Sequence, residues 1–251
     1  MSAANLALLA AAVFFAGMVD ALAGGGGLIT LPAYLALGLH PALILGTNKL
    51  CSAIGTAAST ARYARGLRFK PAGLAWAVGA ALAASVLGAR LALLLDPRWM
   101  RWVLLVSLPL VGAFVYGHGS LDQEDTSHAR PRRVLLARTL SASAPIAAYD
   151  GFFGPGAGTF YALSLTRFCG YDILRATAFA KILNLSSNLA ALVTFLIAGR
   201  VDVRLGLAMS VASVGGNALG ASLGLRRGRG AIRPAMLAVL AGLFLKLLVA
   251  G

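Results

Sequence analysis

The chain has 251 residues, of which 59% are hydrophobic and only 12% are charged, and its mean hydropathy is +0.82. Soluble domains carry roughly 25% charged residues, so this composition excludes an ordinary soluble enzyme, a coiled coil and a disordered chain. Lys and Arg number 22 against 8 Asp and Glu, which gives a net charge of +14. The basic residues form no stripe with interleaved aromatic residues, which argues against nucleic-acid binding. We therefore expect a protein whose main solvent is lipid.

The hydrophobic pattern predicts an all-α polytopic membrane protein with ten helical segments. Some segments are short enough to be re-entrant halves, so eight full spans are the alternative. Ala21–Asn48 has no charged residue, yet it contains four consecutive glycines, Pro32 and Pro41, and we interpret it as broken helices. The predicted segments are 5–23, 28–45, 47–62, 72–95, 101–117, 134–153, 157–170, 176–198, 204–225 and 232–250.

The basic residues gather between these segments, in clusters at 62–70, 130–138, 167–175 and 226–233. With ten spans, all these clusters fall on one side, which the positive-inside rule assigns to the cytoplasm. The polar stretch 118–133 is then a cytoplasmic linker between a first transmembrane repeat, 1–117, and a second, 134–251. We expect an inner-membrane location with both termini extracytoplasmic. The first helix is expected to be retained rather than cleaved as a signal peptide, because no basic residue precedes it.

The two halves resemble each other at positions about 130 residues apart. An acid followed four residues later by glycine occurs at Asp20–Gly24 and again at Asp150–Gly154. Further matches join Lys49 to Lys181 and Gly88 to Gly220. Five segments in each half make such a repeat inverted and four make it parallel. The uneven distribution of basic residues favours the inverted arrangement of pseudo-symmetric repeats.

The two glycine runs are candidate substrate-binding segments. Unpaired amide groups at the start of a broken helix bind anions, and glycine lets a ligand approach the backbone. The alternative is that the glycines only permit close helix packing or a tight turn. The candidates are Gly24, Gly25, Gly26, Gly27, Gly154, Gly156 and Gly158.

Lys49 and Lys181 stand in mainly apolar stretches, where ionisable residues are rare and usually functional. Together with nearby amides and hydroxyls they would form a positive, hydrogen-bonding cavity for an anion. The alternative is that both lysines reach to the membrane interface. The polar neighbours assigned to this cavity are Asn48, Ser52, Asn184 and Asn188.

Asp20 and Asp150 are the matching acidic pair. They either pair with the lysines, or take up and release protons during transport, or simply end helices at the interface. Cys51 and Cys169 are far apart in the sequence, and three scattered histidines make no metal or redox motif. We predict no metal site, no cofactor and no catalytic residue, and so no enzyme.

Several motifs in combination resemble the sulfite exporter TauE/SafE family over nearly the whole chain outside the linker. These motifs are VDALAGGGGLITLP at 19–32, LGTNKL at 45–50, YDGFFGPG at 149–156, ATAFAKILN at 176–184, SNL at 187–189 and GRGAIRP at 228–234. The resemblance implies a multi-pass inner-membrane protein that moves sulfur-containing anions such as sulfite or organosulfonates. The chain is most similar to the branch whose members are called probable transporters.

The sequence therefore predicts a secondary transporter or exporter of a small anion, with the anionic solute and the lipid bilayer as partners and a homo-oligomer left open. A non-transporting assembly or scaffold protein is the alternative. An intramembrane enzyme is the weaker alternative, because such an enzyme needs clustered nucleophile, base or metal ligands.

Overall fold

The computed structural model describes residues 2–67, 71, 73–95, 124–232 and 234–235. All regular secondary structure in these residues is helical, which confirms the predicted all-α class. The predicted segment 101–117 and nearly all of 232–250 lie outside the described residues. The elements are α1 (Ala3–Ala23), α2 (Gly27–Ala36), α3 (Pro41–Gly66), α4 (Leu74–Leu94), the 3-10 helix η1 (Ser127–Ala129), α6 (Arg132–Phe152), α7 (Ala157–Ser164), the π-helix η2 (Leu165–Cys169), α8 (Ile173–Ile197) and α9 (Val203–Arg227).

The outer surface of the helices is apolar, as expected for a protein in lipid. Helices α1, α4 and α8 are long and apolar enough to cross a membrane. Large apolar side chains on α1, α4, α8 and α9 lie exposed, among them Phe15, Trp76, Leu94, Ile197 and Val211. Soluble proteins rarely expose apolar surface on this scale. The chain is thus an all-α membrane protein.

The break in the first half lies earlier than the sequence suggested. The predicted segments 28–45 and 47–62 meet at Gly46, but α2 ends at Ala36 and α3 runs unbroken through Gly46. The start of α3 is fixed by Pro41 in its first turn and by the His40 side chain, which accepts from the Ala42 amide at 3.3 Å. Gly46 instead serves packing, because a Cβ there would lie 2.1 Å from the carbonyl oxygen of Arg200.

The other broken segments follow the prediction more closely. Helix α7 covers the first part of the predicted 157–170 and continues as the π-helical turn η2. The remaining predicted segments within the described residues differ from the observed helices by a few residues at their ends. Such differences are ordinary for boundaries predicted from a sequence.

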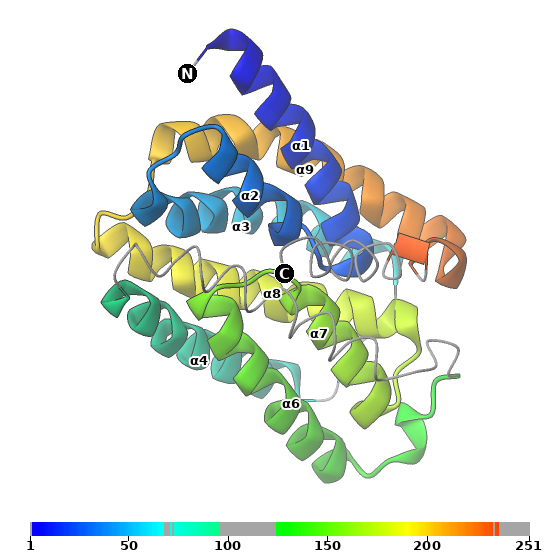
Figure 1. Ribbon diagram of the computed structural model, residues 1–251. Helices are drawn as coiled ribbons and strands as arrows, with labels where there is room; N and C mark the ends of the chain where they lie inside the picture. Colours follow the sequence, from blue (N-terminus) through cyan, green and yellow to red (C-terminus); the bar gives the residue numbers. More distant parts are fainter. Residues whose placement is uncertain (1, 68–70, 72, 96–123, 233, 236–251) are drawn as a thin grey trace, which may run out of the picture.

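Helices α3 and α8 lie at the centre and pack on each other (Figure 1). Helix α9 packs on α1 and α3, whereas α4 packs on α6 and α8. The sequence repeat relates α1 to α6, α3 to α8 and α4 to α9, so these two sets of contacts are equivalent. The membrane orientation of the halves, inverted or parallel, stays a prediction.

Glycines at matching positions make the outer helix crossings close. A Cβ on Gly88 of α4 would lie 1.9 Å from the carbonyl oxygen of Ala148 in α6. A Cβ on Gly220 of α9 would lie 2.3 Å from the carbonyl oxygen of Met18 in α1. Small residues allow backbones to approach in this way in membrane proteins. The repeated glycines therefore hold equivalent crossings in the two halves.

Candidate functional site

The two helix breaks meet near the centre of the molecule. Gly24 ends α1 with φ +78°, and Gly156 precedes α7 with φ +79°. A Cβ on Gly24 would lie 2.2 Å from the carbonyl carbon of Gly158, so the two glycine runs are in backbone contact. The Thr159 hydroxyl of α7 donates to the carbonyl oxygen of Ala23 at the end of α1. The breaks thus form one joint between the halves.

Lys49 of α3 forms an ion pair with Asp150, which lies in the last turn of α6. The distance from Nζ to Oδ1 is 2.7 Å, and both side chains are only 2% exposed. Lys49 also donates to the Asn188 side-chain oxygen at 2.9 Å. The second carboxylate oxygen of Asp150 accepts from the Asn184 amide at 2.9 Å and from the Ser187 hydroxyl. This ion pair is therefore buried and closely hydrogen-bonded.

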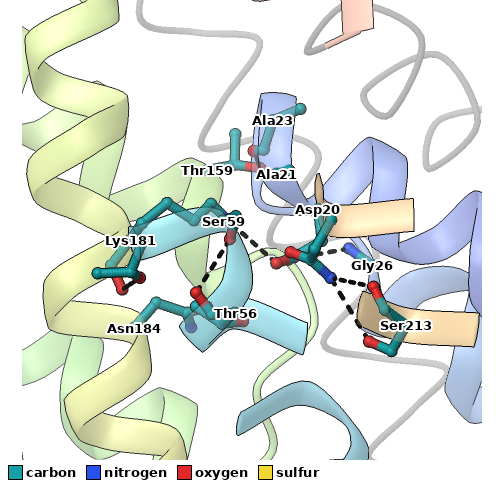
Figure 2. Close-up of polar contacts among 12 residues, drawn as sticks. Asp20, Ala21, Ala23, Gly26, Thr56, Ser59, Thr159, Lys181, Asn184 and Ser213 are labelled. Carbon is teal, nitrogen blue, oxygen red and sulfur yellow. Dashed lines mark hydrogen bonds and ion pairs between the residues drawn. The ribbon is translucent and has the colours of Figure 1, made fainter. Parts of the chain in front are cut away.

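Lys181 of α8 makes the corresponding pair with Asp20, in the last turn of α1. Its Nζ lies 2.8 Å from Oδ2 of Asp20, and Figure 2 shows the lysine extending from α8 to this carboxylate. The other carboxylate oxygen of Asp20 accepts from the Gly26 amide at a longer 3.4 Å. The Lys181 side chain is 1% exposed and that of Asp20 is 17% exposed.

The two ion pairs cross between the halves, because each lysine binds the acid of the other half. The interpretation that the lysines reach to the membrane interface is therefore wrong: both are buried at the centre. The cavity is also not positive as predicted, because each lysine has a carboxylate within hydrogen-bonding distance. Pairing follows from the cost of burying a lone charge.

A small cavity lies between the ion pairs. Its volume is about 20 Å³, and a cavity needs roughly 10–15 Å³ to hold one water molecule. Its walls come from the helix breaks and from the facing sides of α3 and α8. The lining residues are Asp20, Gly24, Gly27, Asn48, Lys49, Ser52, Asp150, Gly154, Asn184 and Asn188.

Most of the predicted site residues thus surround one cavity, and the others lie just behind it. Gly158 packs on Gly24, and Gly156 precedes α7 in a left-handed conformation. Lys181 supports the wall through Asp20. Gly25 and Gly26 are buried in the break between α1 and α2.

Sequence reasoning missed several neutral polar residues near this cavity. Thr30 of α2 donates to the Asn48 side-chain oxygen at 2.6 Å and so orients it. Ser213 and Asn217 of α9 line a second cavity that adjoins the first at Asp20. Their spacing of four residues on an apolar helix was the available signal, but single hydroxyls and amides are common in transmembrane helices.

Charged or metal-binding groups other than the two pairs are sparse here. Asp20 and Asp150 are the carboxylates among the residues that line the two cavities. In the part of the chain that the structure describes, no three His, Cys, Asp or Glu side chains gather where they could hold a metal ion. The chemistry available at the site is the binding of charge by paired ions, amides and hydroxyls.

The sequence of the chain matches a family model and several known proteins. The family model described as sulfite exporter TauE/SafE matches residues 9–247. The probable membrane transporter protein YfcA of Escherichia coli strain K12 is 36% identical over 246 residues, which cover 96% of this chain and 90% of that protein. A probable membrane transporter protein of Haemophilus influenzae is 36% identical over 234 residues, covering 91% and 89%. No solved structure matches the chain.

Proposed function

Because the chain belongs to the sulfite exporter TauE/SafE family, we propose that it is an inner-membrane secondary transporter of a small anion. Sulfite or an organosulfonate is the leading candidate for the substrate. The family and the names of the relatives, probable membrane transporter proteins, support the transporter class. The crossed ion pairs Lys49–Asp150 and Lys181–Asp20, which line or support one cavity at two helix breaks, carry the proposal for this chain.

The site suits an anion because its cations already hold anionic oxygens. A sulfite or sulfonate oxygen can take the place of the Asp150 carboxylate oxygen beside Lys49, and the lysine keeps the Asn188 side-chain oxygen as its second acceptor. Lys49 of α3 then binds the anion directly, and Lys181 of α8, which lies behind Asp20, adds positive charge to the cavity wall.

The observed cavity is small, because its volume suits about one water molecule. Entry of an anion with several oxygen atoms requires at least one carboxylate to move away from its lysine. Each ion pair joins the two halves. Breaking one pair while the other stays intact therefore provides a means of alternating access. The linker 118–133 is proposed to lie in the cytoplasm and both termini outside.

Flux of sulfite into vesicles that contain the purified protein tests the function. The test variant is Lys49→Met/Asp150→Asn, which removes a whole ion pair and leaves no buried charge unpaired. We expect its flux to fall at least tenfold. The control is Arg65→Ala, an exposed cation in the last turn of α3, which should transport as the unchanged protein does.

Two outcomes contradict the proposal. Unchanged flux in a folded Lys49→Met/Asp150→Asn variant would show that transport does not use this site. Absence of flux in the unchanged protein, with no stabilisation by sulfite or sulfonates in a thermal-shift screen, would favour the non-transporting scaffold instead.

A further inference from the structure

The two acids at equivalent positions are held differently. Both carboxylate oxygens of Asp150 are occupied, one by Lys49 and the other by donors from α8. Asp20 has Lys181 on one oxygen and only the distant Gly26 amide, at 3.4 Å, on the other. Its side chain is 17% exposed, against 2% for Asp150. Asp20 is therefore the carboxylate with a free acceptor position.

The sequence repeat explains this difference. Asn184 and Ser187, which donate to Asp150, stand where the first half has Ser52 and Gly55. Gly55 has no side chain to donate, and its space is occupied by α9: a Cβ there would lie 2.0 Å from the Ser213 hydroxyl oxygen. The first half thus lacks the donors that fix the acid in the second half.

A second cavity reaches Asp20 from the side of α9. Its volume is also about 20 Å³, which is enough for about one water molecule. The side-chain oxygen of Asn217 lines this region, is buried, and has no hydrogen-bond partner among the described residues. The polar walls of the cavity are Asp20, Thr30, Cys51, Ser52, Ser213 and Asn217.

The second cavity interrupts the repeat. In the sequence repeat, Thr30, Cys51 and Ser213 correspond to Phe160, Leu183 and Ala81. These three residues are apolar and buried. Asn217 corresponds to Ser85, whose hydroxyl already donates to the Ser187 carbonyl oxygen at 2.6 Å. The residues around Asp20 are thus polar and leave space for water. The residues at the matching positions of the repeat are either apolar and buried or already hydrogen-bonded.

We propose that Asp20 binds a coupling proton, delivered through the second cavity, whereas Asp150 remains the fixed counter-ion of Lys49. This inference rests on the proposed anion transport. A proton that arrives from the aqueous phase as hydronium passes through the second cavity and forms an O–H bond on Oδ1 of Asp20, and neutral water remains behind. Lys181 then loses its ion pair and becomes an unpaired cation beside the first cavity. A monoanion restores neutrality there, so that one proton and one anion bind together.

The groups that face Asp20 are consistent with this coupling. Lys181 of α8 contacts it, and Lys49 of α3 and Asp150 of α6 share the first cavity with it. From α3, Cys51 lines the second cavity and Tyr63 donates to the neighbouring Ala21 carbonyl oxygen. Helices α2 and α9 present neutral Thr30, Ser213 and Asn217 to the second cavity, and Thr159 of α7 donates to the Ala23 carbonyl oxygen. Loss of the negative charge of Asp20 therefore acts first on Lys181.

Binding of ethanesulfonate between pH 5.5 and 8.5 tests the assignment, because this probe keeps one negative charge throughout. Calorimetry on the full-length protein should show affinity falling as the pH rises, by up to tenfold per pH unit for one linked proton. Asp20→Asn, which imitates the protonated acid, should bind with an affinity that does not change with pH. The matched variant Asp150→Asn, which removes the counter-ion of Lys49 but leaves Asp20 in place, should keep the pH dependence.

A pH dependence that persists in Asp20→Asn would overturn the proton assignment while leaving anion binding intact. If the unchanged protein neither binds nor transports ethanesulfonate or sulfite, the proposed function itself is refuted. Asn217→Leu, which fills the second cavity, provides a check that leaves Asp20 in place. In vesicles, proton uptake driven by an ethanesulfonate gradient should fall at least tenfold in this variant, and unchanged uptake would exclude the second cavity as the route.

Discussion

Lys49 and Asp150 lie 101 residues apart in the sequence and form a buried ion pair with 2.7 Å between Nζ and Oδ1. The lysine belongs to the first half and the acid to the second, and Lys181 with Asp20 makes the reverse connection. Neither half alone can neutralise its own central lysine. The ion pairs therefore make the two halves depend on each other and hold the helix breaks in register.

Removal of one member of this pair should destabilise the protein more than removal of both. Lys49→Met leaves the Asp150 carboxylate buried without a cation, which typically costs about 3–5 kcal/mol. Lys49→Met/Asp150→Asn leaves no net charge and should recover most of that loss. Thermal unfolding in detergent, followed by circular dichroism, measures the difference. Equal destabilisation in the single and double variants would contradict the pairing.

The sequence predicted the participants of this site better than their partners. The lysines, the acids and the glycine runs stand out because ionisable residues and glycine clusters are unusual in apolar segments. Spacing along the chain does not tell which acid meets which lysine, because that depends on how α3 and α8 pack. The predicted positive cavity was wrong because both lysines are paired with carboxylates.

The missed features have a similar physical cause. Hydroxyl and amide side chains such as Thr30 and Asn217 can donate to the carbonyl oxygen four residues earlier, so they are tolerated in apolar helices and an apolar pattern hides them. The break at 37–40 was placed too late, at Gly46. In the structure it permits close approach of the Arg200 carbonyl oxygen to α3.

Contact between the helix breaks should make Gly24 intolerant of any side chain. Gly24→Ala adds a methyl group 2.2 Å from the Gly158 carbonyl carbon, at a position with φ +78°. Backbone strain of this kind costs about 1–3 kcal/mol before the clash is counted. The control is Gly79→Ala in α4, where nothing lies within 4 Å and alanine favours the helix. Thermal unfolding should show a clear loss for the first variant and none for the second.

The positions of the basic clusters predict a cytoplasmic linker. A reporter inserted at Gln123 should read as cytoplasmic, and one inserted at Gly199, between α8 and α9, as extracytoplasmic. Gly199 is a suitable site because nothing lies within 4 Å of an added Cβ. An extracytoplasmic signal from Gln123 would reverse the orientation. Signals from the same side at both positions would exclude the ten-span arrangement.

The segment at the end of the linker should detach from the rest of the protein in acid. Asp125 accepts from the Ser127 amide at 2.8 Å and pairs with Arg175 of α8. The Thr126 amide donates to the Gly170 carbonyl oxygen at 2.8 Å. Burial raises the pKa of Asp125, but hydrogen bonds from Ser127 and Arg175 outweigh it and hold the pKa below its usual value. The carboxylate is thus the form that attaches the segment.

A lowered pKa means that this attachment is complete above about pH 4, the usual value for aspartate, and is lost as the pH falls through the folded value. The effect should be below about 1 kcal/mol, because Arg175 is 48% exposed and solvent weakens the pair. Hydrogen exchange of the amides in η1, corrected for intrinsic rates, should accelerate on acidification. In Asp125→Asn these amides should exchange fast at every pH, and a persistent acid transition in that variant would assign the attachment to another group.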